Sequence, residues 1–274
     1  MRALPSLPVH PPAWLRDLAG AWIFYSVLPA WPSPAPRFER IARFAPWIGA
    51  LHGGGQALLW WGMEGRAPLL AQVALVLALE LILSGGLHMD GAMDTADGLA
   101  AGERVMEAMA DSRVGASGAQ ALAVLLLLKI GALAALGAWA PAALLGAAIW
   151  GRVAPLVAMA RFPYLRPGGT AGFHRAHWAG LDKELRPTLV LLAVLTLPVL
   201  YWQTLQLRAV STGAMLPAVG LLGGLAPALV VPLWLGRRLG GHSGDSYGAC
   251  VEWSTALALM LSAVARLLAV PPAG

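Results

Sequence analysis

A run of acidic residues between Gly85 and Leu99 has the residue types and the spacing of a metal site. It reads GGLHMDGAMDTADGL, and Asp90, Asp94 and Asp97 follow one another at i, i+4 and i+7. On a helix these positions fall within an arc of about 60° and within about 10 Å along the axis. Carboxylates this close repel one another, and a divalent cation removes the repulsion; Mg²⁺ prefers oxygen ligands and often also binds substrate phosphates. The pattern predicts a joint Mg²⁺ site, with a solvated helix face as the simpler alternative.

Three neighbours of these aspartates bear on substrate binding. Gly91 and Gly98 lie beside the acidic positions, and we expect their missing side chains to leave room for a bulky substrate. His88 precedes the first aspartate by two residues. Its imidazole is a candidate substrate contact, metal ligand or proton relay, although a single histidine more often has a hydrogen-bonded structural role.

A second polar stretch, Glu103–Leu122, carries Asp111 and Arg113 before a turn rich in Gly and Ser. A guanidinium binds phosphate oxygens in a two-pronged manner, so Arg113 is a candidate for substrate binding and catalysis. Its alternative role is an anchor at the membrane interface. We expect Asp111 either to complete the metal shell or to orient Arg113 toward the substrate.

A third polar segment, GGHSGDSYGACVE, runs from Gly240 to Glu252. Its glycines precede a predicted helix, whose free N–H groups would suit an anion. Asp245 and Glu252 share a face of that helix, and Asp245 is a candidate substrate contact or, alternatively, an ordinary N-cap. Glu252 lies about two turns inside an apolar span, where a charge is costly and usually functional. We predict a catalytic role for Glu252, with a structural ion pair as the alternative.

Two basic residues, Lys129 and Arg152, also lie within apolar stretches. We predict that they supply positive charge to a phosphate-bearing substrate; the structural alternative is an ion pair with Glu252. Glu80 lies near the end of another apolar stretch. It is expected to be paired or to extend its carboxylate toward the membrane surface.

The composition indicates that membrane helices position these residues. Of 274 residues, 58% are hydrophobic and 12% are charged, about half the charged fraction of an ordinary soluble domain; the mean hydropathy is +0.66. Apolar blocks approach the roughly 20 residues that a helix needs to cross a bilayer. We predict an all-α, polytopic helical bundle that forms one domain over residues 1–274. Its expected spans are Ile41–Trp61, Ala67–Ser84, Ala119–Ala138, Ala142–Arg161, Thr188–Leu205, Ala214–Leu235 and Tyr247–Ala269.

The first of these spans is the weakest, because Pro46 and Gly53–Gly55 interrupt it. It is expected to be kinked or partly re-entrant, which leaves six or seven full spans. The preceding segment, Ala13–Leu28, is expected to form an amphipathic helix at the membrane interface, since its aromatic residues suit the headgroup region.

Basic residues gather on one side of this predicted topology. With the N-terminus inside, fourteen lie on cytoplasmic segments, whereas only Arg66 and Arg208 lie on the opposite side. The positive-inside rule therefore places three polar loops at the cytoplasmic face, and the active site with them. These loops lie near Leu87–Gly118, Phe162–Pro187 and Gly236–Ser246. The fourteen are Arg2, Arg16, Arg37, Arg40, Arg43, Arg104, Arg113, Arg161, Arg166, Arg175, Lys183, Arg186, Arg237 and Arg238.

Other partners and compartments are constrained by what the sequence contains. The basic residues form no stripe interleaved with aromatics, so the net charge of +5 does not predict nucleic-acid binding. The single Cys250 fits a reducing compartment. The Pro-rich N-terminus lacks the pattern of a cleavable signal peptide, and none is expected.

Taken together, the polar segments resemble the signature segments of the cobalamin synthase family. GGLHMDGAMDTADGL, MADSRVGASGAQAL and GGHSGDSYGACVE match in order and spacing, and IFYSVLP and the intramembrane Lys129 are also similar. The resemblance covers most of the chain. It implies an adenosylcobinamide-GDP ribazoletransferase, which is a Mg²⁺-dependent, membrane-integral enzyme, and hence a multi-pass protein of the bacterial inner membrane.

The resemblance also implies a reaction. A hydroxyl of α-ribazole, or of α-ribazole 5′-phosphate, attacks the cobinamide-linked phosphorus of adenosylcobinamide-GDP, and GMP leaves. Asp97 or Glu252 is expected to accept the hydroxyl proton, and Arg113, Lys129 and Arg152 are expected to add positive charge. A homo-oligomer and contacts with other enzymes of cobalamin biosynthesis stay open as further partners.

Two alternative functions stay open, a CDP-alcohol phosphotransferase and a transporter. A CDP-alcohol phosphotransferase also uses spaced aspartates near a membrane face, but its Asp-xx-Asp-Gly-xx-Ala-Arg core is absent, because Leu99, Ala100 and Ala101 follow Gly98. A transporter would carry polar residues near the middle of the bilayer and often an internal repeat. Here the acidic residues gather at one end of the predicted bundle.

Overall fold

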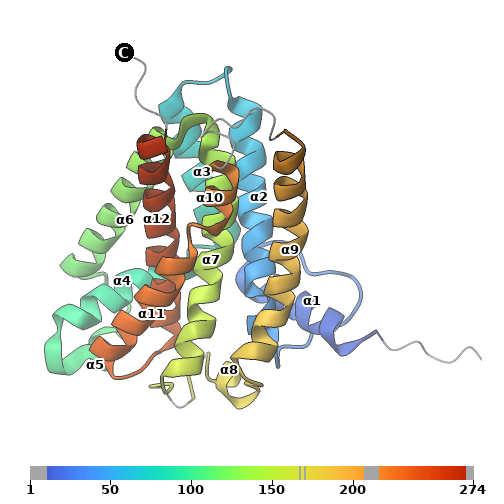
Figure 1. Cartoon of the computed structure of the whole chain (residues 1–274). Helices are drawn as coiled ribbons and strands as arrows, with labels where there is room; N and C mark the ends of the chain where they lie inside the picture. Colours follow the sequence, from blue (N-terminus) through green and yellow to red (C-terminus); the bar gives the residue numbers. More distant parts are fainter. Residues whose placement is uncertain (1–10, 167, 170, 207–215, 270–274) are drawn as a thin grey trace, which may run out of the picture.

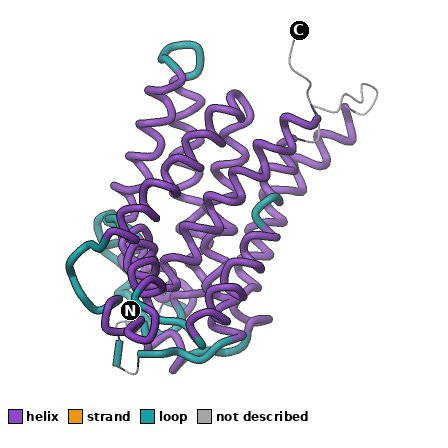
Figure 2. The backbone as a smooth tube through the Cα atoms, turned by 90° about the vertical axis from the view of Figure 1, so that its left-hand side faces the viewer, coloured by secondary structure: helices purple, strands orange, loops and turns teal. Residues whose placement is uncertain are grey.

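The computed structural model describes residues 11–166, 168–169, 171–206 and 216–269, and these residues form a bundle of helices joined by loops (Figures 1 and 2). Within these ranges, β pairing is limited to one isolated parallel bridge between Tyr164 and His242. The predicted all-α class is confirmed. The helices are α1 (Ala13–Tyr25), η1 (Ile41–Phe44), α2 (Ala45–Met63), α3 (Leu69–Ser84), α4 (Leu87–Ala100), η2 (Gly102–Arg104), α5 (Val105–Ala108), α6 (Ala116–Leu136), η3 (Gly137–Trp139), α7 (Ala140–Arg161), α8 (Gly172–Ala176), α9 (Leu181–Gln206), α10 (Leu216–Leu222), α11 (Leu225–Leu239) and α12 (Gly244–Ala269).

Three helical stretches are long and apolar enough to cross a membrane: Ala116–Arg161, Val219–Leu239 and Gly244–Ala269. A fourth is formed if α3 and α4, which meet at an angle of 90°, count as one broken or re-entrant span. Within the first stretch the chain reverses direction near Gly137, between α6 and α7 (Figure 1). The chain is therefore a candidate multi-pass membrane protein. Each of the seven predicted spans overlaps a helix, with residues 214–215 outside the described ranges; the count of seven spans stays a prediction.

The predicted interruption of the first span is wrong, because α2 is one continuous helix from Ala45 to Met63. Pro46 lies in its first turn, where the missing N–H leaves no helical hydrogen bond unmade. Gly53 faces α7, and a Cβ at this position would lie 2.8 Å from the carbonyl oxygen of Leu144. The glycine thus allows close helix packing. The sharp bend instead lies between α3 and α4, which meet at 90°.

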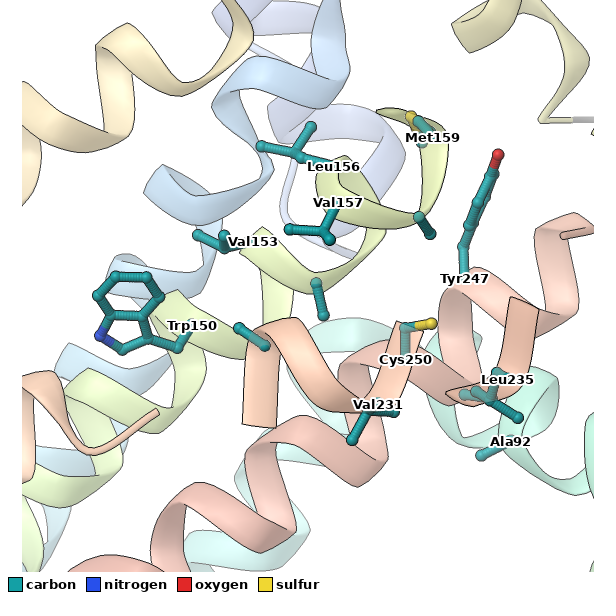
Figure 3. Packing of buried hydrophobic residues seen from close by; sticks show 14 of the residues in the cluster. Ala92, Trp150, Val153, Leu156, Val157, Met159, Val231, Leu235, Tyr247 and Cys250 are labelled. Carbon is teal, nitrogen blue, oxygen red and sulfur yellow. The ribbon is translucent and has the colours of Figure 1, made fainter. Parts of the chain in front are cut away.

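The main hydrophobic cluster forms where α7 meets its neighbours. It combines buried side chains of α4, α7, α11 and α12, part of which Figure 3 shows. Trp150 donates a hydrogen bond of 2.8 Å from its indole nitrogen to the carbonyl of Leu221, which satisfies a buried polar group. Cys250 is fully buried in this cluster with a free thiol. This packing sets the positions of α4 and α12, which carry the acidic residues of two of the predicted polar segments.

The N-terminal helix α1 confirms the helix predicted over Ala13–Leu28 but ends at Tyr25. Its Asp17 is completely buried. The carboxylate accepts a hydrogen bond of 2.6 Å from Arg37 and pairs with Arg43. A buried carboxylate with two guanidinium partners holds α1 against the chain that leads into α2. As a result, the end of α1 reaches the region beside α4 and α12.

Candidate active site

Helix α4 presents the three aspartates on a helix, as predicted. Two consecutive glycines with positive φ, Gly85 at 61° and Gly86 at 73°, end α3 and start α4. Residues with side chains rarely adopt this conformation, so the glycines allow the sharp turn. Asp90 is exposed, whereas Asp94 and Asp97 are half-buried. The turn thus directs an acidic helix across the end of the bundle.

Helices α4 and α12 touch backbone to backbone at two glycines. A Cβ on Gly91 would lie 2.5 Å from the carbonyl oxygen of Asp245, and one on Gly248 would lie 3.0 Å from that of His88. Gly98 likewise faces the side chain of Met109. The expectation of space for a substrate is therefore wrong for Gly98, whereas Gly91 also lines the cavity described below, and its part in substrate binding stays a prediction. These glycines allow helices to pack closely, which brings the acidic residues of α4 and α12 together.

Asp90, Asp94 and Asp97 share α4, and the backbone of Asp245 on α12 packs against Gly91 of the same helix, so four acidic residues lie in one neighbourhood. Arg166 is the basic partner of this group. Its guanidinium lies 3.1 Å from Asp245 Oδ2 and 3.3 Å from the carbonyl oxygen of Met106. The sequence placed Arg166 only among the basic residues of a loop, because nothing in its local spacing marks it as a partner of α12.

Asp97 binds the start of the next helix. Its two carboxylate oxygens accept hydrogen bonds of 2.8 Å from the backbone N–H groups of Gly115 and Gly118, at the N-terminus of α6. A negative charge is favourable there, because the free N–H groups carry partial positive charge. A Cβ on Gly118 would lie 2.5 Å from Asp97 Oδ2. The contact orders the polar segment that follows α4, and the metal-binding and catalytic roles of Asp97 stay predictions.

Joint binding of Mg²⁺ by Asp90, Asp94 and Asp97 also stays a prediction. Among the residues that the structure describes, no group of three or more His, Cys, Asp and Glu side chains is arranged to hold a metal ion. Mg²⁺ is often held by one or two carboxylates, while water and substrate phosphates supply the other ligands. Asp90 and Asp94, with Asp245 nearby, fit this second mode of binding.

Asp111 and Arg113 pair with each other in the loop between α5 and α6. Arg113 Nη2 lies 2.6 Å from Asp111 Oδ2, and the Arg113 side chain is 88% exposed. The pKa of Asp111 is lowered to about 2, because the Arg113 side chain and backbone N–H donate hydrogen bonds to its carboxylate. Of the two expectations for Asp111, the contact with Arg113 is observed; binding of phosphate by Arg113 stays a prediction.

Glu252 forms a buried ion pair. Lys129 Nζ lies 2.7 Å from Glu252 Oε2 and 2.8 Å from Glu80 Oε2, and all three side chains are at most 9% exposed. Lys129 is one of the two partners expected if Glu252 is structural, and Glu80 is paired, as expected. The predicted catalytic role of Glu252 is therefore not supported by its surroundings, although it stays a prediction for experiment.

Arg152 is also buried but belongs to a different group. Its guanidinium donates a hydrogen bond of 3.1 Å to the carbonyl of Ala148 and lies 3.2 Å from His52 Nδ1. Arg152 lines a cavity of about 120 Å³ that lies between α1, α4, α7, α8 and α12. Of the predicted site residues, His88, Asp90 and Asp245 line the same cavity. The structure thus places four predicted site residues around one cavity: the basic Arg152 together with His88, Asp90 and Asp245.

Tyr25 and His174 also line the cavity, although neither is among the site residues predicted from the sequence. Both are buried, and the Tyr25 hydroxyl lies 3.3 Å from His174 Nε2. Burial lowers the pKa of His174 to about 4, so this imidazole is neutral near pH 7. Tyr25 belongs to the IFYSVLP segment, whose resemblance was the available signal, whereas the short helix α8 carries no recognisable pattern.

Serine side chains cap the start of α12, where an anion site is predicted, and binding of an anion there stays a prediction. The backbone N–H of Ser246 donates a hydrogen bond of 3.2 Å to Ser243 Oγ, and the N–H of Ser243 donates one of 2.8 Å to Ser246 Oγ. Serine side chains therefore cap this end. Asp245 is not the N-cap residue, and its carboxylate faces Arg166 instead.

A comparison with known proteins identifies the family to which this site belongs. The profile of the cobalamin-5-phosphate synthase family matches residues 17–263, a range that includes the acidic helix, Lys129 and the whole cavity. The chain belongs to the cobalamin-5-phosphate synthase family. The resemblance of the three polar segments is thereby confirmed.

Curated relatives of this cobalamin-5-phosphate synthase family member match it over most of its length. The adenosylcobinamide-GDP ribazoletransferase of Prochlorococcus marinus is 57% identical over 261 residues, which cover 92% of this chain and 97% of the relative. That of Trichormus variabilis is 40% identical over 248 residues, covering 89% and 95%. That of Synechocystis sp. is 39% identical over 260 residues, covering 90% and 94%. No solved structure matches the chain.

Proposed function

We propose that the chain transfers the adenosylcobinamide-phosphate group from adenosylcobinamide-GDP to α-ribazole or its 5′-phosphate. The products are adenosylcobalamin, or its 5′-phosphate, and GMP. The observation that carries this proposal is the 57% identity to a ribazoletransferase over 97% of that relative's length. The acidic residues beside a cavity support it, because a nucleotide-activated phosphate and an alcohol acceptor must both be bound there.

The reaction exchanges one phosphorus–oxygen bond for another. A hydroxyl oxygen of the acceptor attacks the phosphorus that carries the cobinamide group, and the bond from this phosphorus to the oxygen of GMP breaks. The hydroxyl proton passes to a carboxylate. Asp245 suits this role better than the predicted Asp97 and Glu252, because it lines the cavity, whereas Asp97 binds backbone N–H groups and Glu252 is paired with Lys129.

The residues around the cavity fit a magnesium ion that is shared with substrate phosphates. Asp90 and Asp94 would hold the ion. Asp245 lies close to these two residues, because its backbone packs against Gly91 of α4. When bound, Mg²⁺ neutralises pyrophosphate oxygens and stabilises the leaving phosphate. The chain itself positions the carboxylates through the contact of Gly91 with α12. Arg166 offsets part of their charge.

We place the protein in the inner membrane of a bacterium, as a multi-pass protein with its active site facing the cytoplasm. Three to four candidate spans support insertion in the bilayer. The bias of Lys and Arg toward the predicted inner segments supports the orientation. The site residues Asp94 and Arg166 belong to two of these inner segments, so both are expected at the cytoplasmic face of the membrane.

Incubation of the purified protein with adenosylcobinamide-GDP, α-ribazole and Mg²⁺ tests the function. GMP and adenosylcobalamin should appear in equal amounts, and a chelator should stop their formation. Asp94→Asn should lower Mg²⁺-dependent turnover by about 100-fold or more, the size of effect expected for loss of an electrostatic contact in the transition state. Asp182→Asn is the matched control, since Asp182 is 70% exposed on α9. Absence of GMP release by the wild-type protein would contradict the proposal.

A further inference from the structure

Arg152 is a buried cation whose partners are uncharged. Its side chain is 2% exposed, and its guanidinium contacts the carbonyl of Ala148 and Nδ1 of His52. In the part of the chain that the structure describes, Arg152 takes part in no ion pair, and its Nε has no hydrogen-bond partner. A buried charge without a counter-charge is costly. The surroundings of Arg152 therefore favour the binding of an anion.

The contrast with Lys129 shows where this anion can bind. Lys129 lies 2.8 Å from Glu80 and 2.7 Å from Glu252, so both of these carboxylates are already paired, and neither is within ion-pair distance of Arg152. Arg152 instead lines the cavity between α1, α4, α7, α8 and α12. The cavity is the space next to Arg152 that a counter-ion can enter.

Two histidines add hydrogen-bond donors to the same cavity. His88 and His174 both line it and are each 5% exposed, and among the described residues Nδ1 of each ring has no hydrogen-bond partner. The Tyr25 hydroxyl lies 3.3 Å from His174 Nε2. A neutral imidazole carries one N–H, so a hydrogen bond donated by Tyr25 to Nε2 leaves the proton of His174 on Nδ1. An oxygen-rich anion would supply the acceptors that these groups lack.

The size and the opening of the cavity limit what can bind. Its volume is about 120 Å³, and an apolar cavity of about 150 Å³ in another protein holds one benzene molecule. A phosphate group is smaller than benzene, whereas a nucleoside or a corrin ring is far larger. Asp90 is exposed and Leu87 is 45% exposed, so they mark the open side, whereas the buried Arg152 marks the enclosed side. The cavity therefore suits a phosphate at the end of a larger molecule.

We infer that the enclosed side of this cavity binds the 5′-phosphate of the acceptor nucleotide through Arg152, an inference that rests on the proposed function. This phosphate ends its molecule, so it can enter the cavity while the rest of the acceptor stays at the open side. The two phosphates of the donor lie between cobinamide and guanosine, and they could not enter without one of these larger groups. The 5′-phosphate is unchanged by the reaction. Arg152 thus determines the preference for the phosphorylated acceptor without touching the reacting phosphorus.

Steady-state kinetics with two acceptors test this assignment. Loss of a hydrogen bond to a charged group weakens binding by about tenfold or more. Arg152→Gln should therefore lower kcat/KM for α-ribazole 5′-phosphate by about tenfold or more, while kcat/KM for α-ribazole and the KM for the donor stay within about threefold. A merely structural role of Arg152 would lower kcat/KM for both acceptors alike. Arg161→Gln is the matched control, because Arg161 is exposed at the end of the same helix.

A second variant keeps the test decisive if Arg152→Gln does not fold. Leu87 lines the cavity at its open side, so Leu87→Glu adds a negative charge there with little disturbance of the core. Because like charges repel, kcat/KM should fall about tenfold more for α-ribazole 5′-phosphate than for α-ribazole. Leu87→Gln has a similar size without the charge and should keep the ratio of the two values within about threefold. An unchanged ratio in either folded variant, Arg152→Gln or Leu87→Glu, or a loss confined to the donor KM, would overturn the inference.

Direct binding separates this inference from the proposed function. Equilibrium dialysis of α-ribazole 5′-phosphate, without donor, should show binding to the wild-type protein that inorganic phosphate displaces, and about tenfold weaker binding to Leu87→Glu. Wild-type protein that releases GMP, while Arg152→Gln and Leu87→Glu bind the phosphorylated acceptor as tightly as it does, would refute the phosphate site and leave the function intact. Wild-type protein that releases no GMP would refute the function itself.

Discussion

Loss of Lys129 should destabilise the protein more than loss of Glu252. The ammonium lies between two buried carboxylates, 2.8 Å from Glu80 and 2.7 Å from Glu252. Lys129→Met leaves both carboxylates without this partner, and breaking a buried ion pair in this way costs about 3–5 kcal/mol. Glu252→Gln leaves Lys129 paired with Glu80, so the expected loss of stability is smaller. It should be about 1.5–3 kcal/mol, the contribution of one hydrogen bond to a charged group.

Thermal unfolding of the purified variants measures these costs. A change of 1 kcal/mol shifts Tm by about 2–4 °C in a protein of roughly this size, so Lys129→Met should lower Tm by about 6 °C or more. The variant that combines Lys129→Met with Glu252→Gln should lose less stability than the sum of the two single losses. The reason is that Glu252→Gln removes one of the two carboxylates that Lys129→Met leaves unpaired. Lys183→Met, at an exposed position of α9, is the matched control and should melt close to the wild type.

Two results would refute this reasoning. Lys129→Met protein that melts with the wild type would show that the buried triad does not stabilise the fold. Glu252→Gln protein that keeps its Tm while GMP release falls by roughly 100-fold would establish Glu252 as a catalytic group, as loss of a general base has effects of this size.

Three further predictions follow from local contacts. Gly91→Ala should lower Tm by several degrees and reduce turnover, because the added Cβ would lie 2.5 Å from a backbone oxygen of α12. Gly54 faces open space, so Gly54→Ala is the control and should change neither Tm nor turnover. Equal melting temperatures of the two variants would contradict the close helix contact. Stability should decline as pH falls from about 6.5 to about 4, because His174 stays neutral in the folded protein over this range while an unfolded chain binds the proton. His174→Phe should flatten the dependence of Tm on pH over this range. An unchanged slope would show that His174 does not cause the loss of stability. Cysteines introduced at positions 100 and 240 should both react with a membrane-impermeant reagent from the cytoplasmic side, and labelling from opposite sides would refute the topology.

The sequence by itself determined which segments are helical and apolar, and that the aspartates of α4 share a helix. These properties depend on local spacing, since a side chain's place on a helix follows from the helical repeat alone. The motifs also determined the family, because their order and spacing are read along the chain. For the same reason Asp90 and Asp245 were recognised before their helices were placed.

Only the tertiary structure decided which of these residues are partners. Glu80, Lys129 and Glu252 lie on three different helices. The sequence shows that each lies within an apolar stretch, but it does not show which charged group each side chain faces. Asp97 and Gly115 came from separate polar segments whose contact depends on the turn between them. The crossing of α4 and α12, set by glycines that permit backbone contact, decided where the acidic residues meet. Helical periodicity defines a face, whereas the neighbour of that face is chosen by the packing of the whole bundle.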